Sequence, residues 1–254
     1  MRDKVDAVMS KVPEVTLGFW VIKIGATTLG ETAGDTVTMT LNWGYLAGTA
    51  LFVVLLVALV AAQIVAKRFN PLLYWATIVA STTFGTTMAD FADRSLGIGY
   101  TGGSSLLFAC LIAVLATWYR TEGTVSVNTV TTPRAEAFYW VAITLSQTLG
   151  TALGDWLADT GGLGYEGGAL VFGIGLVVVA ALYLWTHASR VALFWIAFIL
   201  TRPLGATVGD LLDKPLNQGG LAVSRPLASA AIAVFIGLCL LVLPQRPGRH
   251  PGTS

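Results

Sequence analysis

Four aspartates recur in this chain at equivalent places of a repeated pattern, and all four lie in strongly apolar sequence. Each aspartate follows a tryptophan by fifteen residues and a glycine by five. The aspartates are Asp35, Asp90, Asp155 and Asp210, the tryptophans are Trp20, Trp75, Trp140 and Trp195, and the glycines are Gly30, Gly85, Gly150 and Gly205. Such a register indicates an internal repeat. It would place four carboxylates at equivalent positions, where they could bind a cation or carry protons.

The residues that precede each aspartate in steps of four share one edge of a helix. By repeat, these edges read Lys23, Thr27, Glu31, Asp35; Ile78, Thr82, Thr86, Asp90; Ile143, Gln147, Thr151, Asp155; and Phe198, Arg202, Ala206, Asp210. Polar edges of membrane helices turn away from lipid, so four equivalent edges predict a polar centre. The edges differ in composition, which favours a site that meets one substrate from several sides.

Carboxylate, hydroxyl and amide oxygens together are typical ligands of a hard cation. We therefore expect an ion or protons to be carried by the acids Glu31, Asp35, Asp90, Asp155 and Asp210, with neutral ligands from Thr27, Thr82 and Gln147. A divalent, manganese-like metal is one candidate for these acids. Lys23 and Arg202 would tune the acids or occupy the site when no ion is bound. A structural alternative stays open, in which the aspartates only cap turns at helix ends.

Other recurring positions have structural interpretations. The four tryptophans are expected to anchor the helices at the membrane interface. The four glycines would permit close helix packing or act as hinges. Three further acids that follow the motif aspartates are expected at the outer surface, namely Asp93, Asp159 and Asp213.

The composition excludes several classes of protein. Of the 254 residues, 55% are hydrophobic and 11% are charged, against roughly 25% charged in a typical soluble domain. The mean hydropathy of +0.73 predicts a membrane protein. A net charge of +1 without a basic cluster argues against nucleic-acid binding. We find no nucleophile–base pair, no His/Cys ligand cluster and no phosphate loop, so we expect neither an enzyme nor a cofactor.

Each repeat contains the motif segment and a second, plainer apolar segment, such as residues 45–66. Two helices per repeat predict an all-α, polytopic protein with eight transmembrane helices. The expected division is a cytoplasmic amphipathic segment (1–15), repeat 1 (16–68), repeat 2 (69–119), a cytoplasmic linker (120–136), repeat 3 (137–189), repeat 4 (190–244) and a cytoplasmic tail (245–254), all within one membrane domain.

The basic residues outside the motif helices predict the orientation. Ten of them fall on one side, namely Arg2, Lys4, Lys11, Lys67, Arg68, Arg120, Arg134, Arg190, Arg246 and Arg249, and three on the other, namely Arg94, Lys214 and Arg225. By the positive-inside rule, both termini and the linker are expected in the cytoplasm. Because each repeat has an even number of helices, all four repeats would run parallel around an axis along the membrane normal.

The chain resembles a bacterial integral membrane family built from four tandem two-helix repeats of unknown function, each with a characteristic tryptophan. The resemblance is carried by Trp20, Trp75, Trp140 and Trp195 with their downstream glycine and aspartate, over nearly the whole chain. It implies eight helices and an inner-membrane location, and it implies no activity.

Three functions are compatible with these patterns. The leading hypothesis is a transporter of a small inorganic cation, divalent or proton-coupled, that uses the intramembrane carboxylates. The second is a carrier or receptor for a small organic or anionic molecule, bound by Lys23 and Arg202. The third is a non-transporting membrane scaffold. The expected partners are the lipid bilayer and a small cation or proton, and homo-oligomerisation stays open.

Overall fold

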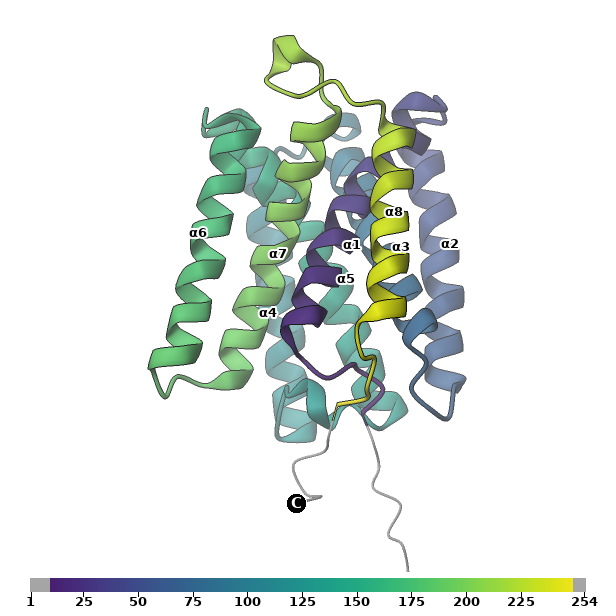
Figure 1. Ribbon diagram of the computed structural model, residues 1–254, viewed down its shortest axis with the longest axis vertical. Coiled ribbons are helices and arrows are strands. Elements are labelled where there is room, and N and C mark those ends of the chain that lie inside the picture. The colour runs from purple at the N-terminus through teal and green to yellow at the C-terminus, as the bar shows by residue number, and fades with distance from the viewer. Residues whose placement is uncertain (1–9, 249–254) are drawn as a thin grey trace, which may run out of the picture.

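A computed structural model describes residues 10–248 of the chain (Figure 1). As predicted, the described residues are helical, and their only β contact is one isolated bridge between Pro13 and Pro247. They form eight long helices: α1 (Leu17–Asp35), α2 (Gly44–Val65), α3 (Pro71–Asp90), α4 (Tyr100–Glu122), α5 (Pro133–Asp155), α6 (Gly164–Trp185), α7 (Arg190–Asp213) and α8 (Arg225–Val242). The odd-numbered helices carry the repeated motif and are called the motif helices below.

Each motif helix begins at a polar side chain that accepts a hydrogen bond from a backbone N–H of the first turn. These caps are Thr16, Asn70, Thr132 and Ser189. Such residues satisfy N–H groups that have no partner inside the helix. At the other end, α1, α3 and α5 widen after the motif aspartate into π-helical turns: η1 (Thr36–Thr40), η2 (Phe91–Ser95) and η4 (Trp156–Thr160). α7 instead continues as a regular α-helix to Asp213.

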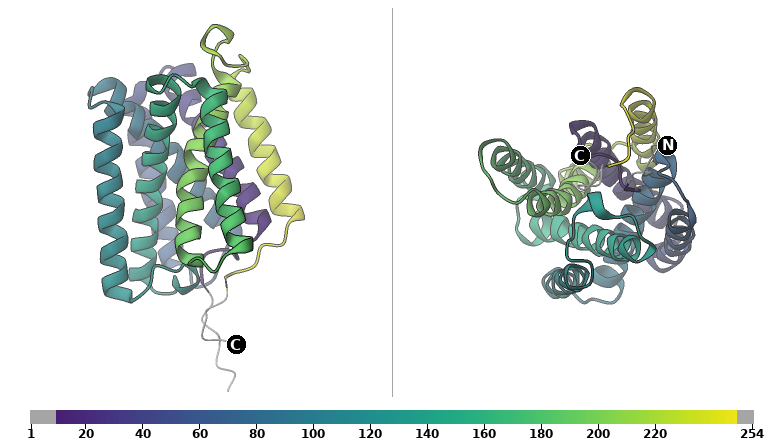
Figure 2. Two further views of the ribbon diagram at one scale, coloured as in Figure 1. Left: turned by 90° about the vertical axis from the view of Figure 1, so that its left-hand side faces the viewer. Right: turned by 90° about the horizontal axis from the view of Figure 1, so that it is seen from below.

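The four motif helices form a closed ring. α1 packs against α3, α3 against α5, α5 against α7, and α7 against α1. The view along the bundle in Figure 2 shows the other helices outside this ring. Each outer helix packs on the motif helix of the following repeat: α2 on α3, α4 on α5 and α6 on α7, and α8 closes the circle on α1. The ring therefore encloses the polar edges of all four motif helices.

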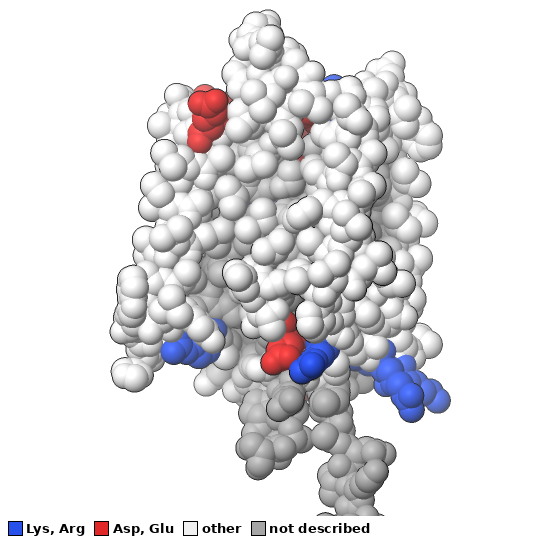
Figure 3. Space-filling view, viewed as in Figure 1, with Lys and Arg blue, Asp and Glu red and all other residues white. Residues whose placement is uncertain are grey.

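The outer helices present apolar side chains to the surroundings. Five helices, α2, α4, α6, α7 and α8, are long and apolar enough to cross a membrane. On the face in Figure 3, charged side chains lie near the two ends, with a wide uncharged band between them. These features indicate a membrane protein. α1, α3 and α5 are less apolar because they contribute polar edges to the enclosed centre.

The first and last described segments, residues 10–14 and 246–248, meet the central linker at one end of the bundle, which we call the terminal end. Backbone N–H groups of Ser10, Lys11 and Glu14 donate to Gly248, Val130 and Arg246, at 3.2, 3.2 and 2.8 Å. The predicted amphipathic segment lies mainly outside the described residues, and its residues 10–15 form no helix. The linker is shorter than expected because α4 extends to Glu122 and α5 begins at Pro133.

Candidate functional site

The motif glycines lie where neighbouring motif helices touch. A Cβ atom built on Gly30, Gly85, Gly150 or Gly205 would clash with the next helix in the ring, at Thr82, Gln147, Arg202 and Thr27, in that order. The same contact is thus repeated four times around the ring. The motif helices run unbroken through these glycines, so glycine acts here by permitting close packing. This packing holds the polar edges around a narrow axis.

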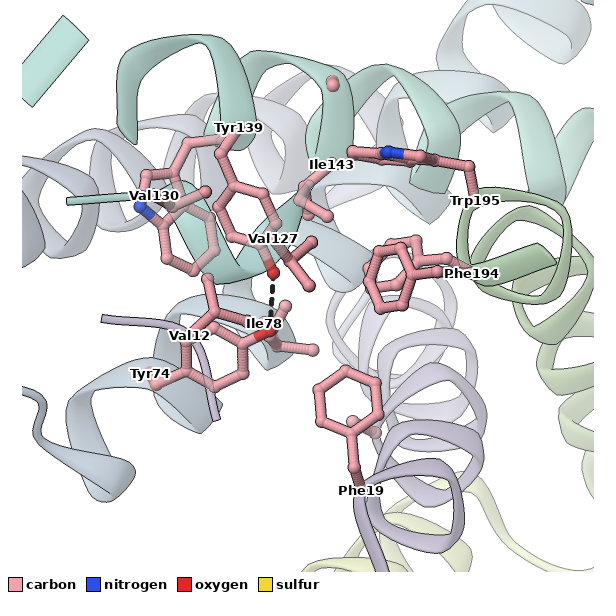
Figure 4. Close-up of a cluster of buried hydrophobic side chains, with 14 of the residues drawn as sticks. Val12, Phe19, Tyr74, Ile78, Val127, Val130, Tyr139, Ile143, Phe194 and Trp195 are labelled. Atoms are coloured by element: carbon pink, nitrogen blue, oxygen red, sulfur yellow. Dashed lines mark hydrogen bonds between the residues drawn. The ribbon is translucent and has the colours of Figure 1, made fainter. Parts of the chain in front are cut away.

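Aromatic rings close this axis at the terminal end. Phe19, Tyr74, Tyr139 and Phe194 point towards one another in Figure 4, and the hydroxyls of Tyr74 and Tyr139 are 2.6 Å apart. The motif tryptophans lie beside them. Trp75, Trp140 and Trp195 are only 2–5% exposed, and Trp20 is partly buried.

The contacts of these tryptophans differ from those of lipid-facing interfacial anchors. The indole N–H of Trp75 donates to Gln245 Oε1 at 3.1 Å, and that of Trp195 donates to the carbonyl of Val125 at 3.0 Å. The residues contacted belong to the C-terminal segment and to the linker. Trp75 and Trp195 therefore join the bundle to the segments that cover its terminal end.

Lys23 lies one turn beyond the aromatic rings and is fully buried. Its Nζ donates to Gln147 Oε1 at 3.3 Å and lies 4.1 Å from the centre of the Phe198 ring. Among the described residues, no carboxylate lies within ion-pair distance of Lys23. The partners of this amine are thus a neutral oxygen and an aromatic face, a weak arrangement for a buried ammonium.

Arg202 ties the four motif helices together. Its Nη2 lies 2.9 Å from Glu31 Oε2 and donates to the hydroxyls of Thr86 and Thr151. Glu31 and Arg202 are both buried. Because Arg202 belongs to α7 and its three acceptors belong to α1, α3 and α5, one guanidinium contacts the whole ring.

The two threonines expected as neutral ligands, Thr27 and Thr82, behave differently. The Thr27 hydroxyl donates to backbone carbonyls, including that of Thr201 on α7 at 3.1 Å. The hydroxyl of Thr82 is buried without a hydrogen-bond partner among the described residues. Thr27 therefore serves the helix contact, whereas Thr82 retains a free polar group inside the ring.

Two of the four aspartates meet at the opposite end of the bundle, which we call the acidic end. Lys214 Nζ lies 2.7 Å from Asp35 Oδ2 and 2.8 Å from Asp210 Oδ1. Oxygens of Glu31, Asp35 and Asp210 all lie within 4.8 Å of one another, and all three residues are buried. We call these three residues the acidic cluster. Carboxylates this close are suited to binding a hard cation.

The other two motif aspartates are outside this cluster. Asp90 pairs with Arg94 at 2.8 Å, one turn along its own chain segment. Asp155 is 4% exposed and has no ion-pair partner among the described residues. The four aspartates are thus equivalent in the repeat but unequal in their surroundings.

The comparison with known families decides the identity of the repeat. A family model described as "Repeat of Unknown Function (DUF347)" matches residues 18–69, 73–124, 138–189 and 193–244. The chain belongs to this family. A search of the curated proteins gave no match, and a search of the solved structures gave none either.

The DUF347 repeats contribute unequally to the acidic end. The acidic cluster is formed where the fourth repeat meets the first, since Glu31 and Asp35 lie on α1 and Asp210 on α7. Asp213, expected at the outer surface, is buried instead. It lies 3.9 Å from Lys214 and 3.4 Å from Arg225. The reason is that α7 continues without a π turn, which keeps Asp213 over the cluster.

Sequence reasoning missed the roles of Lys214 and Arg225, which it counted only as loop charges. A local signal existed for Lys214, because it follows Asp210 by one helical turn. Its contact with Asp35 had no local signal. Burial lowers the pKa of the Lys214 ammonium, but the carboxylates of Asp210, Asp35 and Asp213 outweigh that effect and raise it above its ordinary value. Lys214 is therefore a fixed positive charge at this site.

Proposed function

We propose that this protein is a transporter of a small inorganic cation in the bacterial cytoplasmic membrane. In this proposal all eight helices span the membrane, as four parallel repeats around an axis along the membrane normal, and both termini are cytoplasmic. Support comes from the apolar outer helices, the uncharged band between the two ends and the excess of basic residues at the terminal end.

The acidic cluster is the observation that carries the proposal. Three buried carboxylates within 4.8 Å of one another repel each other strongly unless a cation lies among them. In the structure the Lys214 ammonium contacts Asp35 and Asp210, and the Arg202 guanidinium contacts Glu31. A metal ion would replace Lys214 and use the same oxygens. Lys214 would then be a tethered competitor that holds the site when no ion is bound.

The charge balance favours a divalent ion or protons as the cargo. Six buried carboxylates belong to the motif helices from the level of Glu31 to the acidic end, and four basic side chains contact them. The acids are Glu31, Asp35, Asp90, Asp155, Asp210 and Asp213, and the bases are Arg94, Arg202, Lys214 and Arg225. The excess of two carboxylates is costly in a membrane and would be offset by one divalent ion or two protons.

Access to the cluster differs between the two ends. At the acidic end, a groove of about 300 Å³ is lined by residues that include Thr40, Asp213 and Arg225, and Asp213 and Arg225 both lie near Lys214 or Asp35. At the terminal end, the Tyr74–Tyr139 contact and its neighbouring rings close the axis. An ion entering through the groove would be released only after the aromatic rings separate, which is an alternating-access scheme.

Cation flux into proteoliposomes tests the proposal. The cargo panel would be Mn²⁺, Mg²⁺, Ca²⁺ and protons, with Asp35→Asn and Asp210→Asn as the test variants. Asp159→Asn is the matched control, because Asp159 is an exposed acid at the same end. We expect each test variant to reduce flux of the cargo at least tenfold and the control to retain it.

Two results would overturn the proposal. One is flux that persists in both test variants. The other is folded wild-type protein that moves none of these cations and gains no thermal stability from them, which would favour a scaffold.

A further inference from the structure

A group of buried hydrogen-bond donors without acceptors lies in the ring, on the terminal side of Glu31. Arg202 uses only Nη2 for its three acceptors, and its Nε and Nη1 have no partner among the described residues. The side-chain N–H₂ group of Gln147 and the hydroxyl of Thr82 also have none. Arg202, Gln147 and Thr82 occupy equivalent positions on three motif helices, so these donors face a common axis.

Lys23 adds a second basic side chain to this region. It lies on the remaining motif helix, α1, one turn nearer the terminal end. Its Nζ donates to the amide oxygen of the same Gln147. All four of these side chains are fully buried. The region therefore contains two basic side chains and two neutral donors, and within the described residues the only carboxylate paired with either base is Glu31.

This arrangement is unfavourable without a further ligand. Buried donors that lack acceptors cost free energy, and charged donors cost most. An ammonium at Lys23 and the Arg202 guanidinium, enclosed together, would also repel each other. Glu31 contacts Arg202 only at Nη2 and provides no acceptor for Nε and Nη1. An acceptor with a negative charge, placed between Lys23 and Arg202, would satisfy the free donors and stabilise the ammonium form of Lys23.

We infer that the ring contains a binding site for a small inorganic anion between Lys23 and Arg202, with Gln147 and Thr82 as neutral donors. The size limit follows from the glycine contacts, which bring the four helices close at this level. The aromatic rings lie on one side of the site and the Arg202–Glu31 pair on the other. A halide or another anion of a few atoms fits these limits. This site goes beyond the proposed cation transport and does not depend on it.

Thermal unfolding in detergent tests the anion site. Wild-type protein is compared in sodium chloride, sodium bromide and sodium gluconate at equal concentration, so that the cation is constant. We expect the halides to raise the unfolding midpoint by roughly 5 °C at about a hundred times the dissociation constant. The rise should saturate with concentration, whereas a general salt effect would also follow gluconate.

Lys23→Met is the test variant and Lys67→Met the matched control. Lys67 is an exposed lysine in the segment between α2 and α3. We expect Lys23→Met to lose the halide shift while it stays folded in gluconate, because it removes a buried amine that has no carboxylate partner. Lys67→Met should retain the full shift. Crystals grown in sodium bromide should show anomalous scattering between Lys23 and Arg202.

The inference would be overturned by equal midpoints in chloride and gluconate for the wild-type protein. It would also be overturned if Lys23→Met kept the full halide shift, or if bromide were found only at the protein surface. Gln147→Leu provides a second variant that leaves both charges in place. It should weaken the halide shift without abolishing it, and an unchanged shift would remove Gln147 from the site.

Discussion

Arg202 contacts all three other motif helices through a single nitrogen atom, and its charge is balanced by Glu31 at 2.9 Å. Both partners are buried. Such a pair is weak evidence for stability as a whole, but breaking it leaves an uncompensated charge inside the protein. At the scale of single residues, the polar centre is therefore sensitive to removal of one partner and tolerant of removal of both.

A double-mutant cycle of Glu31 and Arg202 should show strong coupling. We expect Glu31→Gln and Arg202→Met each to lower the free energy of unfolding by about 3 to 5 kcal/mol, because each leaves the other charge unpaired. The double variant should cost clearly less than the sum of the two. Denaturation in a gluconate buffer would measure this without halide effects. Additive costs would show that the pair contributes no interaction energy.

The hydroxyls of Tyr74 and Tyr139 form a buried pair of neutral groups, and removal of one leaves the other without its hydrogen-bond partner. Tyr74→Phe leaves the Tyr139 hydroxyl buried and unpartnered, at an expected cost of about 1 to 3 kcal/mol. The double change to phenylalanine should restore part of this loss. Tyr119→Phe is the control, because Tyr119 is 60% exposed. Thermal unfolding in detergent would measure the stability of each variant. Equal stability of Tyr74→Phe and the control Tyr119→Phe would contradict the importance of the hydroxyl contact.

At the scale of helices, the closest approaches are made by glycine. Gly85 on α3 faces the backbone of α5, where a Cβ would lie 2.9 Å from the carbonyl carbon of Gln147 and 2.9 Å from the nitrogen of Thr148. Backbone atoms cannot move aside as a flexible side chain can. The spacing of α3 and α5 therefore depends on the absence of a side chain at this position.

Gly85→Ala should lower the free energy of unfolding by about 1 to 3 kcal/mol, as expected for overpacking. Gly173→Ala on α6 is the matched control, because a Cβ there would meet no atom within 4 Å. The control should be neutral or stabilising by about 0.5 to 1 kcal/mol, since alanine favours the helix. Unfolding of both variants under the same conditions measures the difference. Equal effects would mean that the helices can separate at Gly85 without cost.

At the scale of the whole molecule, the ring is closed by contacts between the two ends of the chain. α7 and α8 both pack on α1, and Lys214 from the fourth repeat bridges Asp35 of the first and Asp210 of its own. The termini and the linker lie together at the opposite end. The molecule thus has two chemically distinct ends, and its orientation in the membrane decides which faces the cytoplasm.

Single cysteines at the two ends should report this orientation. Cys110 and Cys239 would first be replaced by alanine, and then Arg68→Cys and Gln218→Cys made separately, since both positions are exposed and lie at opposite ends. We expect a membrane-impermeant maleimide to label Gln218→Cys in intact cells and Arg68→Cys only after lysis, because basic residues favour the cytoplasmic side. The reverse labelling would invert the proposed orientation.

The sequence by itself determined the repeat, the all-helical fold, the membrane character and the polar edges of the motif helices. These properties are local, because hydropathy and helical periodicity are read from neighbouring positions along the chain. Only the tertiary structure decided which edges meet. That Lys214 reaches Asp35 and that Arg202 spans the ring depend on ring closure, whereas the pair of Asp90 with Arg94 joins residues four apart. Contacts between residues far apart in the chain arise from packing across repeats, and local sequence patterns do not predict them.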